Sequence, residues 1–259
     1  MSFPDTGPTR IDAFFGGAFH LVQPDGWGYR SGLDAMLLAA CVDEAQGGRA
    51  ADLGAGAGAV GIGAAARAQG LHVTLVEKEA AMAGLARASL GLAQNAALAG
   101  RLHVCEMDAL APRPAREAAG LPDGGFGLVL TNPPFYPAGH RASPDAPRRA
   151  ALSAPDEDFL VRWVRVAAAL LEPRGRLALL ARPADLLAVL EGARNRLGSL
   201  AVLPVHTRPG PATRMLVSGV QGSRREMAVL PGLELFGQGG RERLDAISAG
   251  QYRIDGLSA

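Results

Sequence analysis

An amide, two consecutive prolines and an aromatic ring follow an apolar stretch at Asn132-Pro133-Pro134-Phe135. Each proline lacks a backbone N–H, so the turn offers carbonyl acceptors with few competing donors. The Asn132 side-chain oxygen and the Pro133 carbonyl can accept both hydrogens of one NH₂ group, which turns the nitrogen lone pair toward an electrophile. Phe135 can stack on a flat substrate, which contributes about 1–3 kcal/mol for a base on an aromatic ring. We predict catalytic roles for Asn132, Pro133, Pro134 and Phe135 at a planar exocyclic amine; the alternative is a rigid turn with a core phenylalanine.

A glycine-rich turn spans Gly54 to Gly61 and lets the backbone approach a ligand closely. Gly56, Gly58 and Gly61 match the G-x-G-x-x-G spacing of dinucleotide sites, so the glycines alone do not identify the ligand. Asp52 favours S-adenosylmethionine over NAD. A pyrophosphate at the mouth of the turn would meet its carboxylate at a cost of roughly 1–4 kcal/mol for charges about 4 Å apart. S-adenosylmethionine carries a sulfonium and an ammonium but no phosphate.

Two more acids follow strand-like segments further along the chain. Glu77 can hold a ribose diol, and Asp108 can accept a hydrogen bond from an adenine amino group while Ala109 offers its backbone N–H. With Asp52 they give three acids at three consecutive strand ends. Each acid taken alone is equally well read as an ordinary solvated residue.

Apolar segments alternate with alanine- and leucine-rich segments, as in an α/β protein whose parallel sheet is covered on both faces. The predicted strands are Arg49–Leu53, His72–Glu77, Leu102–Met107, Gly127–Thr131, Arg176–Ala181, Ala201–His206 and Arg214–Val220. The predicted helices are Leu33–Cys41, Ala59–Ala68, Ala80–Ala97, Asp156–Leu171 and Ala184–Leu197. Pro112–Arg116 is expected to be a loop, and the link Thr207–Thr213 is too short for a crossover helix, so the last strand should be antiparallel. The order predicts a Rossmann-like α/β fold with a mostly parallel seven-stranded sheet, with the site at the carboxyl ends of its strands.

The composition is that of an ordinary globular protein, with 48% apolar residues and a net charge of +1 over 259 residues. No apolar run approaches the roughly 20 residues of a membrane span, and the N-terminus lacks an apolar signal core, so we expect a cytoplasmic protein. The histidines and cysteines show no metal-ligand spacing, so no metal is expected. The sequence lacks the G-x-S-x-G elbow that would indicate a hydrolase.

Several arginines follow the predicted strand ends and would meet at one edge of the sheet. The expected substrate-binding arginines are Arg141, Arg148, Arg149, Arg208 and Arg214. A basic rim beside a stacking pocket suits an RNA backbone that carries an extruded base. Because nearly all of the positive charge in this chain is arginine, an ordinary solvated surface is the alternative.

The pairing of Asp52-Leu-Gly-Ala-Gly with Asn132-Pro-Pro-Phe resembles the class I amino-methyltransferases that act on adenine, guanine or glutamine amide nitrogens. With Gly28–Ala35 upstream and Arg208–Arg214 downstream, the chain is more narrowly similar to the bacterial adenine-N6 methyltransferases that modify the anticodon loop of valine tRNA. The resemblance implies a class I methyltransferase domain at 46–259 and an N-terminal segment at 1–45 that closes over the cofactor. The residues that it implies for S-adenosylmethionine are Asp52, Gly54, Ala55, Gly56, Glu77, Lys78, Asp108, Ala109 and Asn132.

We therefore expect methyl transfer from S-adenosylmethionine to the N6 amine of adenine in tRNA or another structured RNA. A protein glutamine N5-methyltransferase shares the pocket logic, although such enzymes usually carry Tyr in place of Phe135 and a separate helical domain. A guanine-N2 rRNA methyltransferase shares the motif. An NAD-binding oxidoreductase is disfavoured by Asp52 and by the lack of an evident hydride-transfer acid.

Overall fold

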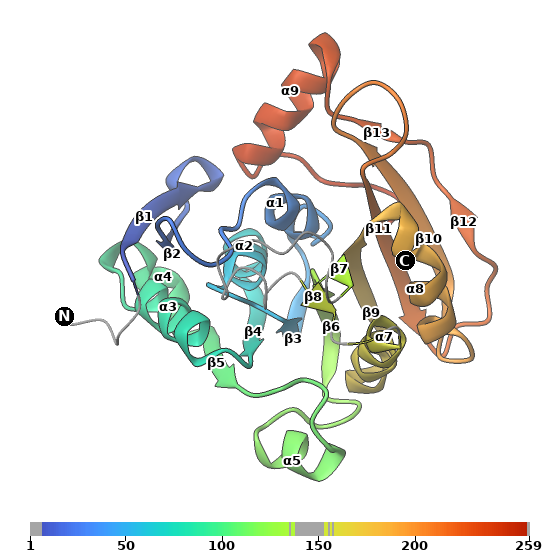
Figure 1. Ribbon diagram of the computed structural model, residues 1–259, viewed down its shortest axis with the longest axis horizontal. Helices are drawn as coiled ribbons and strands as arrows, with labels where there is room; N and C mark the ends of the chain where they lie inside the picture. Colours follow the sequence, from blue (N-terminus) through green and yellow to red (C-terminus); the bar gives the residue numbers. More distant parts are fainter. Residues whose placement is uncertain (1–6, 135, 138–152, 155, 157, 258–259) are drawn as a thin grey trace.

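The computed structural model describes residues 7–134, 136–137, 153–154, 156 and 158–257, and a central sheet organises them (Figure 1). Its spatial order is β12-β10-β11-β9-β6-β3-β4-β5, and β13 also pairs with β10. The long strands are β3 (Gly47–Leu53), β4 (Gly70–Glu77), β5 (Leu102–Glu106), β6 (Phe126–Thr131), β9 (Leu171–Ala181), β10 (Leu197–His206) and β11 (Arg214–Gln221). The short strands are β12 (Ala228–Val229) and β13 (Leu233–Glu234).

The direction of the strands confirms the predicted fold class. β5, β4, β3, β6 and β9 run parallel to one another, whereas β11 runs antiparallel to both β9 and β10. These seven long strands are the predicted ones. β12 and β13 were not predicted, because two residues are too few to form a recognisable pattern.

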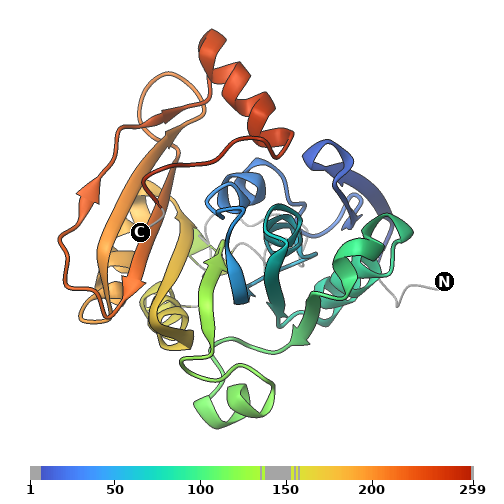
Figure 2. The same ribbon diagram turned by 180° about the vertical axis from the view of Figure 1, so that it is seen from behind.

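Helices cover both faces of the sheet (Figures 1 and 2). They are α1 (Leu33–Ala39), α2 (Ala59–Arg67), α3 (Ala80–Leu90), α4 (Ala96–Ala99), α5 (Arg113–Ala118), α7 (Phe159–Leu170), α8 (Leu186–Ala193) and α9 (Gly237–Ser248). Short 3-10 turns are η1 (Phe15–Gly17), η2 (Ala93–Asn95) and η3 (Pro183–Asp185). Within the described ranges, no helix combines the length and the apolarity that a bilayer crossing needs.

Alternating side chains of the strands build two cores, one on each face of the sheet. Leu128 and Leu130 of β6 pack with α1 and α2, whereas Val129 between them packs with α7 and α8. Successive residues of a strand point to opposite faces, so a strand buried on both sides is apolar throughout. This explains why the continuous apolar runs of the sequence became the parallel strands.

An antiparallel hairpin precedes the sheet and was not predicted. It pairs β1 (Thr9–Phe14) with β2 (Phe19–Pro24). The buried Asn95 fastens it to the turn after α3: its side chain accepts from the His20 backbone N–H at 2.9 Å and donates to the His20 carbonyl at 2.7 Å. Ser89 accepts from the Val22 backbone N–H at 2.9 Å. The hairpin therefore depends on partners about 70 residues away, which local patterns do not reveal.

Several predicted boundaries are wrong for local reasons. The helix expected over Ala80–Ala97 ends at Leu90, because the chain turns at Gly91 so that Asn95 can reach the hairpin. Pro112–Arg116 opens α5 instead of a loop, since proline is well tolerated in the first turn of a helix. The helix expected to extend to Leu197 ends at Ala193, and Leu197 begins β10. α9, which packs against α1 and η1, was not predicted.

Candidate active site

The glycine turn, Glu77 and Asn132 lie together because their strands are neighbours. Leu53 at the end of β3 is registered with Val76 on β4 and with Thr131 on β6. The backbone N–H groups of Gly54 and Ala55 both donate to the Val76 carbonyl, at 2.9 and 3.0 Å. The residue that follows each strand therefore opens onto one edge of the sheet, as predicted for ligand sites of parallel sheets.

The turn after β3 needs glycine at three alternate positions. Gly54, Gly56 and Gly58 have φ of +73°, +58° and +93°, a region that other residues adopt at a cost. An added Cβ at Gly58 would lie 3.0 Å from Leu75 and 3.1 Å from Ile62, so these side chains would have to shift to admit it. The turn ends at Ala59, the first residue of α2, and the Gly61 N–H in the first turn of this helix donates to the Asp52 carboxylate.

Glu77 holds this turn from the neighbouring strand. One carboxylate oxygen accepts from the Gly56 backbone N–H at 2.8 Å, and the other accepts from the Glu79 backbone N–H at 2.9 Å. Only 8% of the residue is exposed, and burial raises the pKa of its carboxyl, partly offset by these two donors. Glu77 is thus a nearly buried acceptor fixed at the turn, in a place where a ribose diol can reach it.

Asp52 does not lie at the mouth of the turn, which corrects the prediction. It is 1% exposed, and its carboxylate accepts from the Gly61 backbone N–H at 2.8 Å, beneath α2. Burial raises the pKa of Asp52 to about 7, partly offset by the Gly61 hydrogen bond and increased by the charge of Glu77. The charge argument against a pyrophosphate therefore fails. Asp52 fixes the position of α2 relative to the glycine turn.

A hydrogen-bonded relay runs beneath the site and was missed by sequence reasoning. The Thr131 hydroxyl donates to the Leu53 carbonyl at 2.8 Å, and the Trp163 indole N–H donates to the same hydroxyl at 2.9 Å. All three residues are buried. An added Cβ on Gly54 would lie 3.4 Å from the Trp163 ring, so the indole also forms the floor of the turn. The relay joins the residue before Gly54 to the residue before Asn132.

Asn132 presents an unsatisfied acceptor at this edge. Its side-chain oxygen is buried and has no hydrogen-bond partner in the part of the chain that the structure describes. Pro133 is buried and Pro134 is half-buried, so the turn is held in place by packing. Phe135 lies outside the described residues. Leaving a buried acceptor unpaired costs about 1–3 kcal/mol, so this atom is suited to a donor on a ligand.

The remaining cofactor candidates lie at the ends of β4 and β5. Asp108 is exposed, and its carboxylate accepts from the Leu110 backbone N–H at 2.8 Å, while Ala109 is buried. Lys78 is exposed, with its ammonium 3.8 Å from the Glu79 carboxylate. The Asp108 carboxylate therefore keeps one oxygen that can accept a hydrogen bond from a ligand. Lys78 points to solvent and supplies little beyond its backbone.

Polar contacts tie the parts of the N-terminal segment to one another. The buried Gln23 accepts from the Ser31 backbone N–H at 2.7 Å and donates to Asp12 at 2.8 Å. Arg30 donates to Asp12 at 2.8 Å as well. Sequence reasoning did not single out Gln23, which lies among the apolar residues of β2 and is 1% exposed.

The predicted arginine rim is described only in part. Arg141, Arg148 and Arg149 lie outside the described residues. Arg208 is exposed in the link between β10 and β11. Arg214 is half-buried and donates to both carboxylate oxygens of Asp34, at 3.1 and 3.0 Å, so it binds the N-terminal segment. No group of three or more potential metal ligands occurs among the residues that could be searched.

Solved structures of methyltransferases share this fold. A predicted O-methyltransferase from Agrobacterium tumefaciens is 36% identical, with a TM-score of 0.71 over 85% of this chain and 98% of that one. The 16S rRNA N2 G1207 methyltransferase of T. thermophilus, in complex with AdoMet and guanosine, is 22% identical, with a TM-score of 0.53 over 90% of this chain and 49% of that one. TYW2 of M. jannaschii, in complex with AdoMet, is 11% identical, with a TM-score of 0.54 over 82% and 85% of the two chains. None of the curated proteins compared with the chain matches it.

The donor set at the site fits S-adenosylmethionine, the cofactor of these structures. The side-chain-free turn at Gly54 and Gly56 leaves room for the amino acid part, and Glu77 supplies a buried acceptor for hydroxyl groups. Asp108 and the Ala109 backbone follow the third strand of this edge and offer an acceptor and an N–H donor of the kind that an adenine needs. The family model of the methyltransferase small domain matches residues 31–185, which include the glycine turn and the Asn132 turn. The chain therefore belongs to the methyltransferase small domain family and is an S-adenosylmethionine-dependent methyltransferase.

Proposed function

We propose that this enzyme transfers the methyl group of S-adenosylmethionine to the exocyclic N6 amine of adenine in tRNA. The observation that carries the proposal is the buried, unpartnered side-chain oxygen of Asn132 in a turn made rigid by two prolines. An exocyclic NH₂ group supplies two donors in one plane. One of them satisfies Asn132, and the Pro133 carbonyl is the acceptor for the other.

The chain's own residues contribute by positioning both reactants. Gly54, Gly56, Glu77, Asp108 and Asn132 would hold the cofactor, which supplies an electrophilic methyl group. Asn132 and Pro133 would hold the amine, so that its lone pair faces that methyl group. Alignment of two reactants can supply several kcal/mol of the rate enhancement without any acid or base.

The relay from Trp163 through Thr131 to Leu53 supports the assignment of the cofactor to the glycine turn and of the amine to the Asn132 turn. It fixes the glycine turn and the Asn132 turn relative to each other by two buried hydrogen bonds. Methyl transfer requires the donor and the acceptor on one line, and displacements of about 1 Å cost orders of magnitude in rate. We further propose that segment 1–45 closes over the cofactor, anchored to the rest of the chain through Asp34 and through the backbone of His20.

An unpaired or easily flipped base is the substrate that this pocket logic favours. A base within a duplex hides its amine, whereas one in a loop can be extruded and stacked. We assign Arg208, with Arg141, Arg148 and Arg149 on sequence grounds, to contacts with the RNA backbone. Arg214 contributes only where RNA binding displaces it from Asp34.

The names of two similar proteins point to other groups that receive the methyl. The Agrobacterium protein is described as an O-methyltransferase and the T. thermophilus enzyme acts at guanine N2. A hydroxyl group has one hydrogen and would leave either Asn132 or Pro133 unpaired, so the geometry favours an amine over a hydroxyl. Guanine and adenine both carry an exocyclic amine, so the distinction between them requires the product.

The test uses bulk tRNA, labelled S-adenosylmethionine and mass spectrometry of the digested nucleosides. We expect N6-methyladenosine with the native chain and at least a 10²-fold lower rate with Asn132→Ala, because one preorganised contact to the transition state is lost. The affinity for S-adenosylhomocysteine should change much less. Glu106→Gln, at an exposed residue that pairs with Arg87, is the matched control. Label in guanosine, in a ribose hydroxyl or in protein would overturn the adenine assignment, and full activity of Asn132→Ala would overturn the role of the turn.

A further inference from the structure

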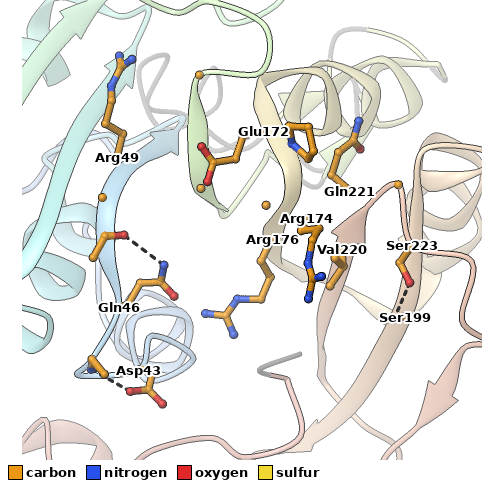
Figure 3. Close-up of a pocket in the computed structure, with 18 of the residues that line it drawn as sticks. Asp43, Gln46, Arg49, Glu172, Arg174, Arg176, Ser199, Val220, Gln221 and Ser223 are labelled. Carbon is orange, nitrogen blue, oxygen red and sulfur yellow. Dashed lines mark hydrogen bonds between the residues drawn. The ribbon is translucent and has the colours of Figure 1, made fainter.

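A second cavity, with a volume of about 1020 Å³, lies at the opposite edge of the sheet (Figure 3). Its walls come from the amino ends of β3, β6, β9 and β10 and from the end of β11. The glycine turn follows the carboxyl end of β3, so the two sites are separated by the length of that strand, roughly 20 Å. The cavity is therefore no part of the active site.

Arg176 lies in this cavity as a buried cation without a carboxylate partner in the described chain. It is 8% exposed, and its guanidinium donates to the carbonyls of Leu257 and Cys41, at 3.1 and 3.2 Å. Burial lowers its pKa, which shows the cost of keeping this charge out of water. Carbonyls carry no net charge, and the charge of Asp43 offsets that of Arg176 only in part, so an anion would stabilise the guanidinium further.

Two further arginines add to this charge. Arg174 and Arg225 line the cavity, are exposed, and form no ion pair among the described residues. Arg174 has a φ of +68°, in a region that favours glycine. In Figure 3, Arg174 and Arg176 lie near the middle of the opening. The acid Asp43, at the edge, is already paired with Arg253 at 2.6 Å.

Acceptors lie beside these cations. The side-chain oxygen of Gln221 is buried without a hydrogen-bond partner within the described ranges. The Glu172 carboxylate also lines the cavity and forms no ion pair there. Figure 3 shows Glu172 toward one side of the two arginines and Gln221 toward the other. A simple anion has no hydrogen to donate to either acceptor, whereas a hydroxyl group donates both to the amide oxygen of Gln221 and to the carboxylate of Glu172.

We propose that this cavity binds a ribose phosphate group, with the phosphate on Arg174, Arg176 and Arg225 and the ribose hydroxyls on Gln221 and Glu172. Arginine pairs strongly with phosphate through parallel N–H donors. The group can belong to a free nucleotide or to an RNA strand, since both present the same chemistry. The proposal does not depend on which amine the enzyme methylates.

The test is isothermal titration of the full chain with ribose 5-phosphate, in the presence of saturating S-adenosylhomocysteine so that the active site is filled. We expect ribose 5-phosphate to bind at least tenfold more tightly than either ribose or inorganic phosphate. Arg174→Ala combined with Arg225→Ala should weaken it at least tenfold, whereas Arg241→Ala, at an exposed arginine of α9, should not. Gln221→Leu should reduce the affinity toward that of inorganic phosphate.

Competition identifies the source of the group. Displacement of ribose 5-phosphate by a single-stranded RNA oligonucleotide, and not by the DNA of the same sequence, would assign the cavity to RNA. Displacement by uridine 5′-monophosphate alone would assign it to a free nucleotide. Absence of ribose 5-phosphate binding, or equal binding by the double variant and by Arg241→Ala, would overturn the proposal. Because these experiments measure binding at this cavity while the active site is filled, their results do not depend on the identity of the methylated amine.

Discussion

The Thr131 hydroxyl donates a 2.8 Å hydrogen bond to the Leu53 carbonyl, although 78 residues separate them in the chain. Thr131 precedes Asn132, and Leu53 precedes Gly54. This bond therefore joins the turn assigned to the amine with the turn assigned to the cofactor. Because Trp163 donates to the same hydroxyl, the junction also connects the sheet to α7.

Thr131→Val should destabilise the protein and reduce turnover. The isosteric change removes the donor to Leu53 and the acceptor for Trp163, and each buried group left unpaired costs about 1–3 kcal/mol. Urea denaturation should show the loss, and turnover should be measured at a temperature where the variant is folded. Thr131→Ser keeps the hydroxyl and is the control. Equal stability of the valine and serine variants would show that the relay contributes nothing.

Glu77→Gln should weaken the binding of S-adenosylhomocysteine at least tenfold. The amide cannot accept from both Gly56 and Glu79 through two oxygens, and hydrogen bonds to a charged group contribute roughly 1.5–3 kcal/mol. Titration calorimetry measures the change. Glu79→Gln alters an exposed neighbour and should bind normally. An unchanged dissociation constant for Glu77→Gln would limit Glu77 to a structural role.

Asp52→Asn should change how stability depends on pH. Burial raises the pKa of Asp52 from its ordinary value of 3.8 to about 7, so the native state holds a proton that the unfolded chain loses first. The native chain should therefore lose stability as the pH rises from about 4 to 7, by up to about 1.4 kcal/mol per pH unit. The neutral asparagine lacks this dependence.

Urea denaturation of both proteins between pH 5 and pH 8 tests this expectation. The free energy of unfolding of the asparagine variant should rise relative to that of the native chain with each step up to pH 7. Above pH 7 the difference should level off. Parallel stability curves for the two proteins would contradict a raised pKa at Asp52.

Arg214→Ala and Asp34→Asn separate the two roles considered for Arg214. The pair is partly exposed, with 35% and 18% of the two side chains accessible, so its loss should cost no more than about 1 kcal/mol of stability. If the pair anchors the N-terminal segment, both variants should weaken S-adenosylhomocysteine binding alike. If Arg214 binds RNA, only Arg214→Ala should weaken tRNA binding, and Asp34→Asn should strengthen it. Filter binding of tRNA and calorimetry with S-adenosylhomocysteine distinguish these outcomes.

The sequence by itself determined the sheet, its direction and the turns to which we assign the chemistry. Apolar strands, short links and a glycine turn are local patterns, and parallel strands bring the residues after them to one edge wherever the sheet forms. Gly54, Glu77 and Asn132 were therefore placed together correctly. The resemblance of their motifs led to the same cofactor as the family match.

Only the tertiary structure decided which polar groups face the ligand and which face the interior. Asp52 and Glu77 both follow the same pattern of an acid at a strand end, yet Asp52 is buried against Gly61 and Glu77 borders the turn. The Thr131 relay and the hydrogen bonds of Arg176 also depend on partners far along the chain. Local patterns fix where a strand begins and ends, but the hydrogen bonds of a buried polar group depend on whichever distant segments the packed core brings beside it.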